Sequence, residues 1–204
     1  MRAMNMGTRS YTKTRRAEHE AETRRRIVEA ALALHTEIGP AQTTISMIAE
    51  RAGVQRHTVY AHFPEERALL MACSGLHIER EPPPSPEAWA GVNDPAVRLR
   101  QALDALYAWY ERNEAITAAV LRDAERHELL REISELRLGT TLAAIAGSLS
   151  GGLASNGKAA LQLALSFHTW RTLMREAGLT PAAAVEMMAR TVLQSDGRVG
   201  AGPA

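Results

Sequence analysis

The chain has 204 residues, of which 46% are hydrophobic and 4% aromatic, and its formal net charge is +1. This apolar content is enough to build a packed core, which argues against a disordered chain, and the scarcity of β-branched runs favours helices over sheets. The only cysteine is Cys73, so an intrachain disulfide and a cysteine-based zinc cluster are excluded.

The N-terminal part of the chain is polar and basic. It has no apolar stretch typical of a signal peptide, and no later segment reaches the roughly 18 apolar residues of a membrane span, so we expect a cytoplasmic protein. Residues 1–62 carry ten Lys and Arg against six Asp and Glu, whereas residues 63–204 carry fourteen against seventeen. The basic part indicates a polyanion partner, although ordinary solvated charge gives the same composition.

Apolar residues recur at helical spacing only after the first 18 residues of the chain. Residues 1–18 show no apolar period, and we expect a flexible basic arm. A first helix is predicted from about Glu20 to Ile38, and Gly39-Pro40 ends it. Thr44 is the predicted N-cap of a short second helix that stops at Gly53.

Further helices follow the same spacing. A third is predicted from about Gln55 to Ala61, and a fourth begins after Pro64 and reaches Arg80, where a proline-rich connector follows. The later helices are predicted over residues 95–113, 114–126, 129–149, 158–177 and 180–194. The fold class is therefore all-α, with a three-helix N-terminal domain and a C-terminal helical bundle. The expected parts are an arm (1–18), a helix-turn-helix domain (19–64), a regulatory and dimerisation domain (65–194) and a frayed tail (195–204).

Residues 44–63 have the pattern of a helix-turn-helix. Ala49 allows the two short helices to approach closely, and Gly53 supplies a backbone conformation that a side chain would penalise. With the aliphatic edge of the third helix turned inward, its polar edge is free to enter a DNA major groove. There Arg56 matches guanine and Gln55 matches adenine or a phosphate. The remaining polar residues of that edge suit phosphates or thymine methyl groups.

The run from Ile27 to Leu70 closely resembles the DNA-binding domain of TetR-family regulators. The family pattern is met, in order, by Gly39, Thr43-Thr44, Ile48-Ala49, Ala52-Gly53-Val54, Thr58-Val59-Tyr60 and His62-Phe63. The resemblance implies contacts with double-stranded operator DNA from Thr44, Ser46, Gln55, Arg56, His57, Thr58, Tyr60 and His62.

Two positions depart from the family pattern, and one charged run allows two interpretations. Gln55 stands where a small hydroxyl residue usually caps the recognition helix, and it is a poorer cap. Glu66 stands where the family often has a phosphate-binding Lys, so either Arg67 takes that role or the contact is absent. The run of residues 24–26 and the arm either contact DNA or form a solvated face.

The family resemblance also implies a homodimer through the last two helices, 158–177 and 180–194. Both helices have apolar residues on more than one face, although burial within the same subunit would explain this too. Aromatic and methionine residues at helical spacing predict a pocket for a small organic effector. The alternative is that these side chains simply pack in the core. The candidate pocket residues are Leu106, Trp109, Tyr110, His168, Trp170 and Met174.

The sequence is thus interpreted as a repressor that an effector releases from a palindromic operator. A non-inducible repressor or an activator with the same fold is the main alternative, and a small helical enzyme is a remote one. Residues 152–159 come near a phosphate-binding loop, but Ala159 lacks the hydroxyl that would hold magnesium. We expect no cofactor, no metal and no catalytic residue.

Overall fold

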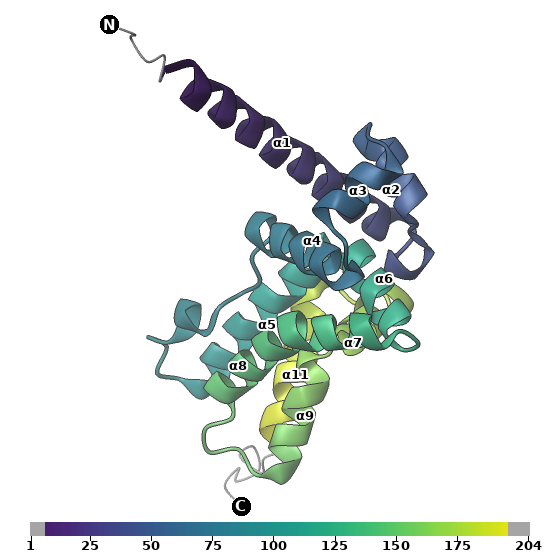
Figure 1. Ribbon diagram of the computed structural model, residues 1–204. Coiled ribbons are helices and arrows are strands. Elements are labelled where there is room, and N and C mark those ends of the chain that lie inside the picture. Colours follow the sequence, from purple (N-terminus) through teal and green to yellow (C-terminus); the bar gives the residue numbers. More distant parts are fainter. Residues whose placement is uncertain (1–6, 196–204) are drawn as a thin grey trace, which may run out of the picture. The chain divides into compact units, whose positions relative to one another are not determined.

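The computed structural model describes residues 7–195, and their side chains from residue 15 onward. Every regular element in that range is helical, as the sequence predicts (Figure 1). The chain divides into two compact units, one ending at Arg80 and the other beginning at Glu81. Within residues 7–195 no helix combines the length and the hydropathy needed to cross a membrane.

The N-terminal unit contains four helices: α1 (Gly7–Glu37), α2 (Ile45–Ala52), α3 (Arg56–His62) and α4 (Glu66–Arg80). A short 3-10 turn, Pro40–Gln42, follows α1. The C-terminal half of α1 packs against α2 and α4, and α2 packs against α3. The apolar residues of these four elements share one core, with Ile27, Ala31, Leu34, Ile48, Ala49, Val59, Phe63, Leu69 and Cys73 among its buried members.

Two boundaries in this unit differ from the sequence expectation. Helix α1 begins at Gly7, so residues 7–18 of the expected arm are helical, and residues 1–6 lie outside the described range. The first unit also ends at Arg80 rather than at residue 64. The reason is that α4 places Leu69 and Cys73 in the same core as α1.

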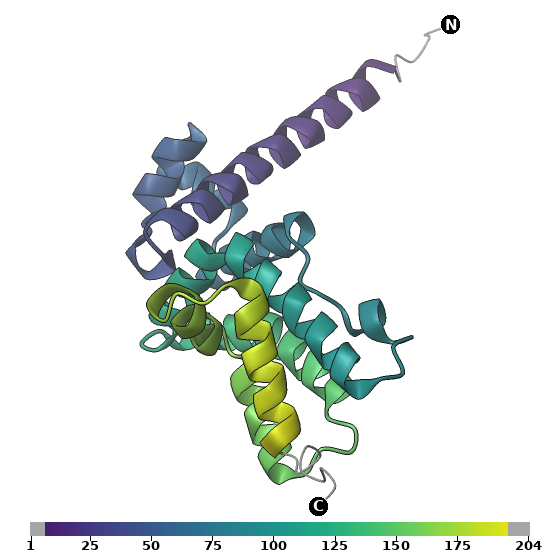
Figure 2. The ribbon, with the colours of Figure 1, turned by 180° about the vertical axis from the view of Figure 1, so that it is seen from behind.

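The C-terminal unit is built around α5 (Pro95–Arg112), whose start is capped by the Asp94 carboxylate. Its other helices are α6 (Glu114–Ala124), α7 (Glu128–Ser134), α8 (Thr140–Leu149), α9 (Ser155–Leu165), α10 (Phe167–Arg171) and α11 (Pro181–Ser195). A π-helical turn, Glu135–Gly139, joins α7 to α8, so this stretch is continuous as predicted. Helix α11 packs against both α9 and α5, and Figure 2 shows α11 alongside α9. The predicted tail lies outside the described residues after Ser195.

The predicted single helix over 158–177 is wrong, because the chain breaks it at Ser166. The backbone of Ser166 is extended (φ −72°, ψ 132°), and its hydroxyl accepts a hydrogen bond from the His168 N–H, 3.2 Å away, to start α10. A π-helical turn, Thr172–Glu176, then completes the segment. A serine cap inside an apolar run therefore divides the helix into two.

Candidate nucleic-acid interface and ligand groove

The turn between α2 and α3 depends on Gly53. Its backbone is left-handed (φ 65°, ψ 39°), and its N–H donates to the carbonyls of Ala49 and Glu50. The Val54 N–H also reaches the Ala49 carbonyl, at 2.9 Å, which completes a glycine C-cap of the Schellman type. Since the side chain of Val54 packs on the core, the turn fixes the direction in which α3 leaves α2.

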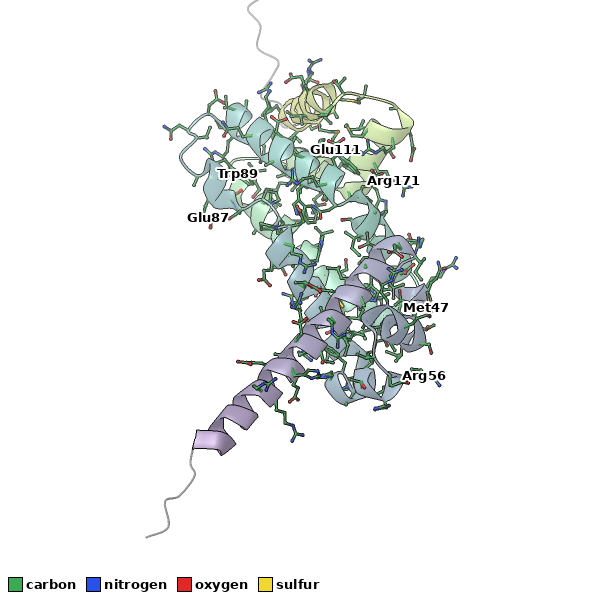
Figure 3. The ribbon with its side chains drawn as sticks, turned by 90° about the horizontal axis from the view of Figure 1, so that it is seen from above. Met47, Arg56, Glu87, Trp89, Glu111 and Arg171 are labelled. Carbon is green, nitrogen blue, oxygen red and sulfur yellow. The ribbon has the colours of Figure 1, made fainter. Side chains whose placement is uncertain are left out.

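Helix α3 presents a polar edge to solvent and an apolar edge to the core. Val59 is fully buried, whereas its neighbour Tyr60 is 55% exposed. Figure 3 shows Arg56 on the outer side of the α2–α3 pair, away from α1. Of the predicted recognition residues, Gln55, Arg56, His57 and Tyr60 are exposed, and Thr58 and His62 are half-buried. The structure therefore brings these six predicted residues together on one short helix and its cap.

The two remaining predicted residues, Thr44 and Ser46, are at the start of α2, the helix that precedes α3. The Thr44 hydroxyl accepts a hydrogen bond from the Met47 N–H at 3.3 Å, so Thr44 is the N-cap, as predicted. Ser46 is exposed in the first turn. An exposed helix start with unpaired N–H groups and hydroxyls is suited to a phosphate.

Both departures from the family pattern are visible in the structure. Gln55 is the N-cap residue of α3, and its side chain makes no capping hydrogen bond, which confirms that it is a poor cap. Glu66 is exposed in the first turn of α4, where a carboxylate interacts favourably with the helix dipole. Arg67 is also exposed, and both alternatives for this position, a phosphate contact from Arg67 or no such contact, stay predictions.

Sequence reasoning did not assign specific partners to the arginines around this motif. Arg24 and Arg26, on α1, donate to backbone carbonyls at the ends of α3 and α2. Arg51, on α2, pairs with Glu37 at the end of α1, and this hydrogen bond lowers the pKa of the Glu37 carboxyl. No sequence motif signals these contacts, since their acceptors include backbone oxygens.

The predicted effector pocket is a packed aromatic core. Leu106, Tyr110 and Trp170 are fully buried, and Trp109 is 5% exposed. The Tyr110 ring lies 5.3 Å from the Phe167 ring and 5.7 Å from the Trp170 ring, measured between centroids. These residues fill the interior instead of lining a cavity. Met174 packs against the same cluster from a half-buried position.

An open groove of about 400 Å³ lies beside that core, within the C-terminal unit. Among the predicted pocket residues only His168 lines it. The sequence analysis missed the other lining residues, which are mostly aliphatic and come from α6, the π turn before α8, α8, α9 and α10: Leu121, Leu138, Leu142, Ala143, Ala146, Gln162, Leu165, Ser166 and Phe167. The lining carries no Asp, Glu, Lys or Arg, so it suits a neutral, largely apolar molecule. Among the described residues no cluster of His, Cys, Asp or Glu could hold a metal ion.

Residues 27–73 match the family described as bacterial regulatory proteins, tetR family. The chain is 31% identical over 106 residues to the HTH-type transcriptional repressor KstR of Mycolicibacterium smegmatis, a match that covers 52% of each protein. It is 46% identical over 59 residues to the HTH-type transcriptional regulator TtgR of Pseudomonas putida, which covers 28% of each. The matches thus span about half, or less, of these curated relatives.

Solved structures with a similar fold cover nearly the whole chain. The TetR family regulator PfmR from Thermus thermophilus is 21% identical, with a TM-score of 0.59, and the likeness covers 87% of this chain and 97% of PfmR. Thermus thermophilus FadR, a TetR family repressor solved with lauroyl-CoA, is 20% identical, with a TM-score of 0.54 and coverage of 89% and 97%. Residues 27–73 thus carry the helix-turn-helix pattern of the tetR family of bacterial regulatory proteins, and the fold of the whole chain is similar to that of solved TetR family regulators.

Proposed function

We propose that the protein is a cytoplasmic transcriptional repressor that binds a palindromic operator as a homodimer and is released by a small organic effector. The observation that carries DNA binding is the polar edge of α3. It exposes Arg56 and Tyr60 while Val59 anchors the helix in the core. A short helix held in this way can enter a major groove, where Arg56 would read guanine and Tyr60 a phosphate.

The homodimer is supported by the outer face of the last helices. Of the five large apolar side chains that are exposed in the described part of the chain, two lie on α9 and α11: Leu163 is 59% exposed and Met187 is 51% exposed. Small exposed residues, Ala159 and Ala183, lie on the same two helices and would allow close helix packing. Because α9 and α11 pack against each other, they form a pair that a second copy can complete to a four-helix bundle.

Effector binding is supported by the groove lined by Leu142, Ala143 and Phe167. Two similar proteins support the repressor and effector parts of the proposal: KstR is named a repressor, and FadR was solved with lauroyl-CoA. An effector that binds more tightly to a state with the wrong spacing of the two DNA-binding domains would reduce operator affinity by that difference in affinity.

Selection of bound duplexes from random DNA tests the proposal. We expect enrichment of a palindrome whose half-sites are separated by about one helical turn, roughly 34–36 Å between recognition helices. Binding should weaken steeply with salt, as phosphate contacts require. Failure of the full chain to enrich any sequence would contradict DNA recognition. Enrichment of a sequence without two-fold symmetry would contradict the homodimer.

A non-inducible regulator is the second candidate, because aromatic side chains fill the interior where a pocket was expected. A reporter under the selected operator separates the two. Loss of repression on addition of a neutral apolar compound supports the inducible repressor. Repression that no compound in a broad library relieves supports the alternative, and activation of the reporter would reverse the sign of regulation.

A further inference from the structure

Three consecutive arginines on α1 have three different environments. Successive side chains on an α-helix point in directions about 100° apart, so three neighbouring arginines on α1 face different parts of the domain. Arg24 reaches α3: its Nη1 lies 3.1 Å from the carbonyl oxygen of His62, and its guanidinium lies 4.0 Å from the centre of the Phe63 ring. His62 is the last residue of α3 and Phe63 is its C-cap.

Arg26 makes the equivalent contact with the other helix of the motif. Its Nη1 lies 3.2 Å from the carbonyl oxygen of Ala52, which is the last residue of α2. The last carbonyls of a helix have no intrahelical donor and carry the negative end of the helix dipole. A guanidinium that donates to them therefore makes a charge-assisted hydrogen bond at a position where a cation is favoured.

Arg25 stands between these two residues and makes no hydrogen bond or ion pair with α2 or α3. It is exposed and pairs with Glu22 at 2.7 Å and Glu29 at 2.8 Å, both on α1 itself. The three residues are thus one charge run in the sequence, but only the first and third join α1 to the helix-turn-helix.

We propose that Arg24 and Arg26 are positioning residues for DNA recognition, which hold the C-terminal ends of α3 and α2 on α1 and do not themselves bind phosphate. The proposal rests on the proposed DNA-binding function. Helix α3 has only seven residues, too few to be stable alone, so its direction depends on its tertiary contacts. Val59 and Phe63 anchor its apolar edge, and Arg24 is the charged contact at its far end.

Loss of either contact would leave the fold intact but reduce the fraction of molecules whose recognition helix has the correct direction. The apparent Kd rises in inverse proportion to that fraction. Sequence-specific binding requires the direction of α3, whereas phosphate contacts elsewhere do not. The number of phosphates neutralised should therefore remain the same in the variants.

The test uses the full-length protein and the duplex that it enriches from random DNA. Arg24→Ala and Arg26→Ala should each bind this duplex about tenfold more weakly, at a temperature where circular dichroism shows both to be folded. Arg25→Ala is the matched control and should bind within about twofold of the wild type. The slope of log Kd against log salt should be the same in all four proteins.

Arg24→Lys and Arg26→Lys keep the charge without the planar fork, so they should recover part of the lost affinity. They also serve as the folded variants if an alanine variant does not fold. Wild-type affinity in the Arg24 and Arg26 variants would overturn the proposal. So would a salt slope lowered by about 0.9, which is the sign of one lost phosphate contact. Failure of the wild type to enrich any duplex would instead remove the proposed function, and the proposal with it.

Discussion

The hydroxyl of Tyr110 donates a 2.7 Å hydrogen bond to the carbonyl oxygen of Leu165, the last residue of α9. One turn away on α5, the Tyr107 hydroxyl donates at 2.9 Å to the carbonyl oxygen of Ala164. Both carbonyls lie where the break at Ser166 interrupts the helix, and both tyrosines are buried. The two phenols therefore supply hydrogen bonds that a continuous helix would have made with its own backbone.

Removal of one hydroxyl should thus destabilise the fold. We expect Tyr110→Phe and Tyr107→Phe each to lower the free energy of unfolding by about 2 kcal/mol, because a buried carbonyl loses its partner while the ring still fills its space. Urea unfolding followed by circular dichroism measures this. Tyr60→Phe is the control, since Tyr60 is exposed and its substitution should leave the urea midpoint unchanged. Equal midpoints in all three variants would mean that water replaces the phenols at no cost.

The same segment shows what the sequence could and could not predict. The Gly39-Pro40 stop, the Thr44 cap and the Gly53 turn are local signals, and the structure has all three. The break at Ser166 also has a local cause, the serine cap. However, the break is stabilised by tyrosines more than fifty residues away, and an apolar period cannot show that partnership.

In the candidate DNA-binding site, too, local features were predictable from the sequence and contacts between distant residues were not. Exposure of Arg56 and Tyr60 follows from the period of a helix that is anchored by Val59, so the recognition edge was predictable. The contacts of Arg24 and Arg26 could not be predicted, because their acceptors are backbone oxygens, which every residue type carries. The aromatic residues expected to line a pocket pack on one another instead. The sequence pattern is the same for aromatic residues that line a pocket and for those that fill a core, and only the tertiary packing distinguishes them.

The recognition edge gives the second prediction. Arg56→Ala should reduce the preference for the selected operator over a variant with one altered guanine by about 1–3 kcal/mol, because a bidentate base contact is lost. Tyr60→Phe should weaken binding to both duplexes by a similar factor if its hydroxyl meets a phosphate. Fluorescence anisotropy with both duplexes separates the two effects. Unchanged binding in both variants would mean that α3 does not read the operator.

The third prediction concerns the proposed dimer face. A carboxylate at Leu163 would be buried and unpaired between two copies, so Leu163→Glu should convert the dimer to a monomer. Light scattering after size-exclusion chromatography measures the mass. Leu136→Glu is the matched control, because Leu136 is similarly exposed but lies on the π turn before α8. A dimer that persists in Leu163→Glu and in Met187→Glu would place the interface on another face.

Cys73 gives a prediction about pH. Burial raises the pKa of its thiol to about 12, whereas an unfolded cysteine titrates near 8.5. The folded state therefore holds this proton more tightly. The resulting stability is fully present below pH 8.5 and is lost as the pH rises toward 12. Between pH 8.5 and 9.5 this group should lower the free energy of unfolding by about 1 kcal/mol.

Urea unfolding of the wild type and of Cys73→Ala at pH 8.5 and 9.5 isolates the contribution of the thiol to the free energy of unfolding. The variant starts from a lower stability because a buried side chain is shortened, but its stability should fall less between the two pH values. Tyrosines begin to titrate near the top of this interval, but they do so in both proteins, so their contribution cancels in the difference. If both proteins lose stability equally, the thiol must already be ionisable in the folded state, and a thiol reagent should then modify it at neutral pH without unfolding.

The last prediction tests the groove as the effector site. Ala143 lines the groove, whereas the next residue, Ala144, is also exposed on α8 but does not line it. Ala143→Phe should place a ring in the apolar space and abolish binding of a neutral environment-sensitive dye such as Nile red, while Ala144→Phe should bind the dye as the wild type does. If the groove also holds the effector, Ala143→Phe should repress the reporter normally and no longer respond to the inducing compound. Retained induction in this variant would place the effector elsewhere, because an occupied groove cannot admit a second apolar group of the same size.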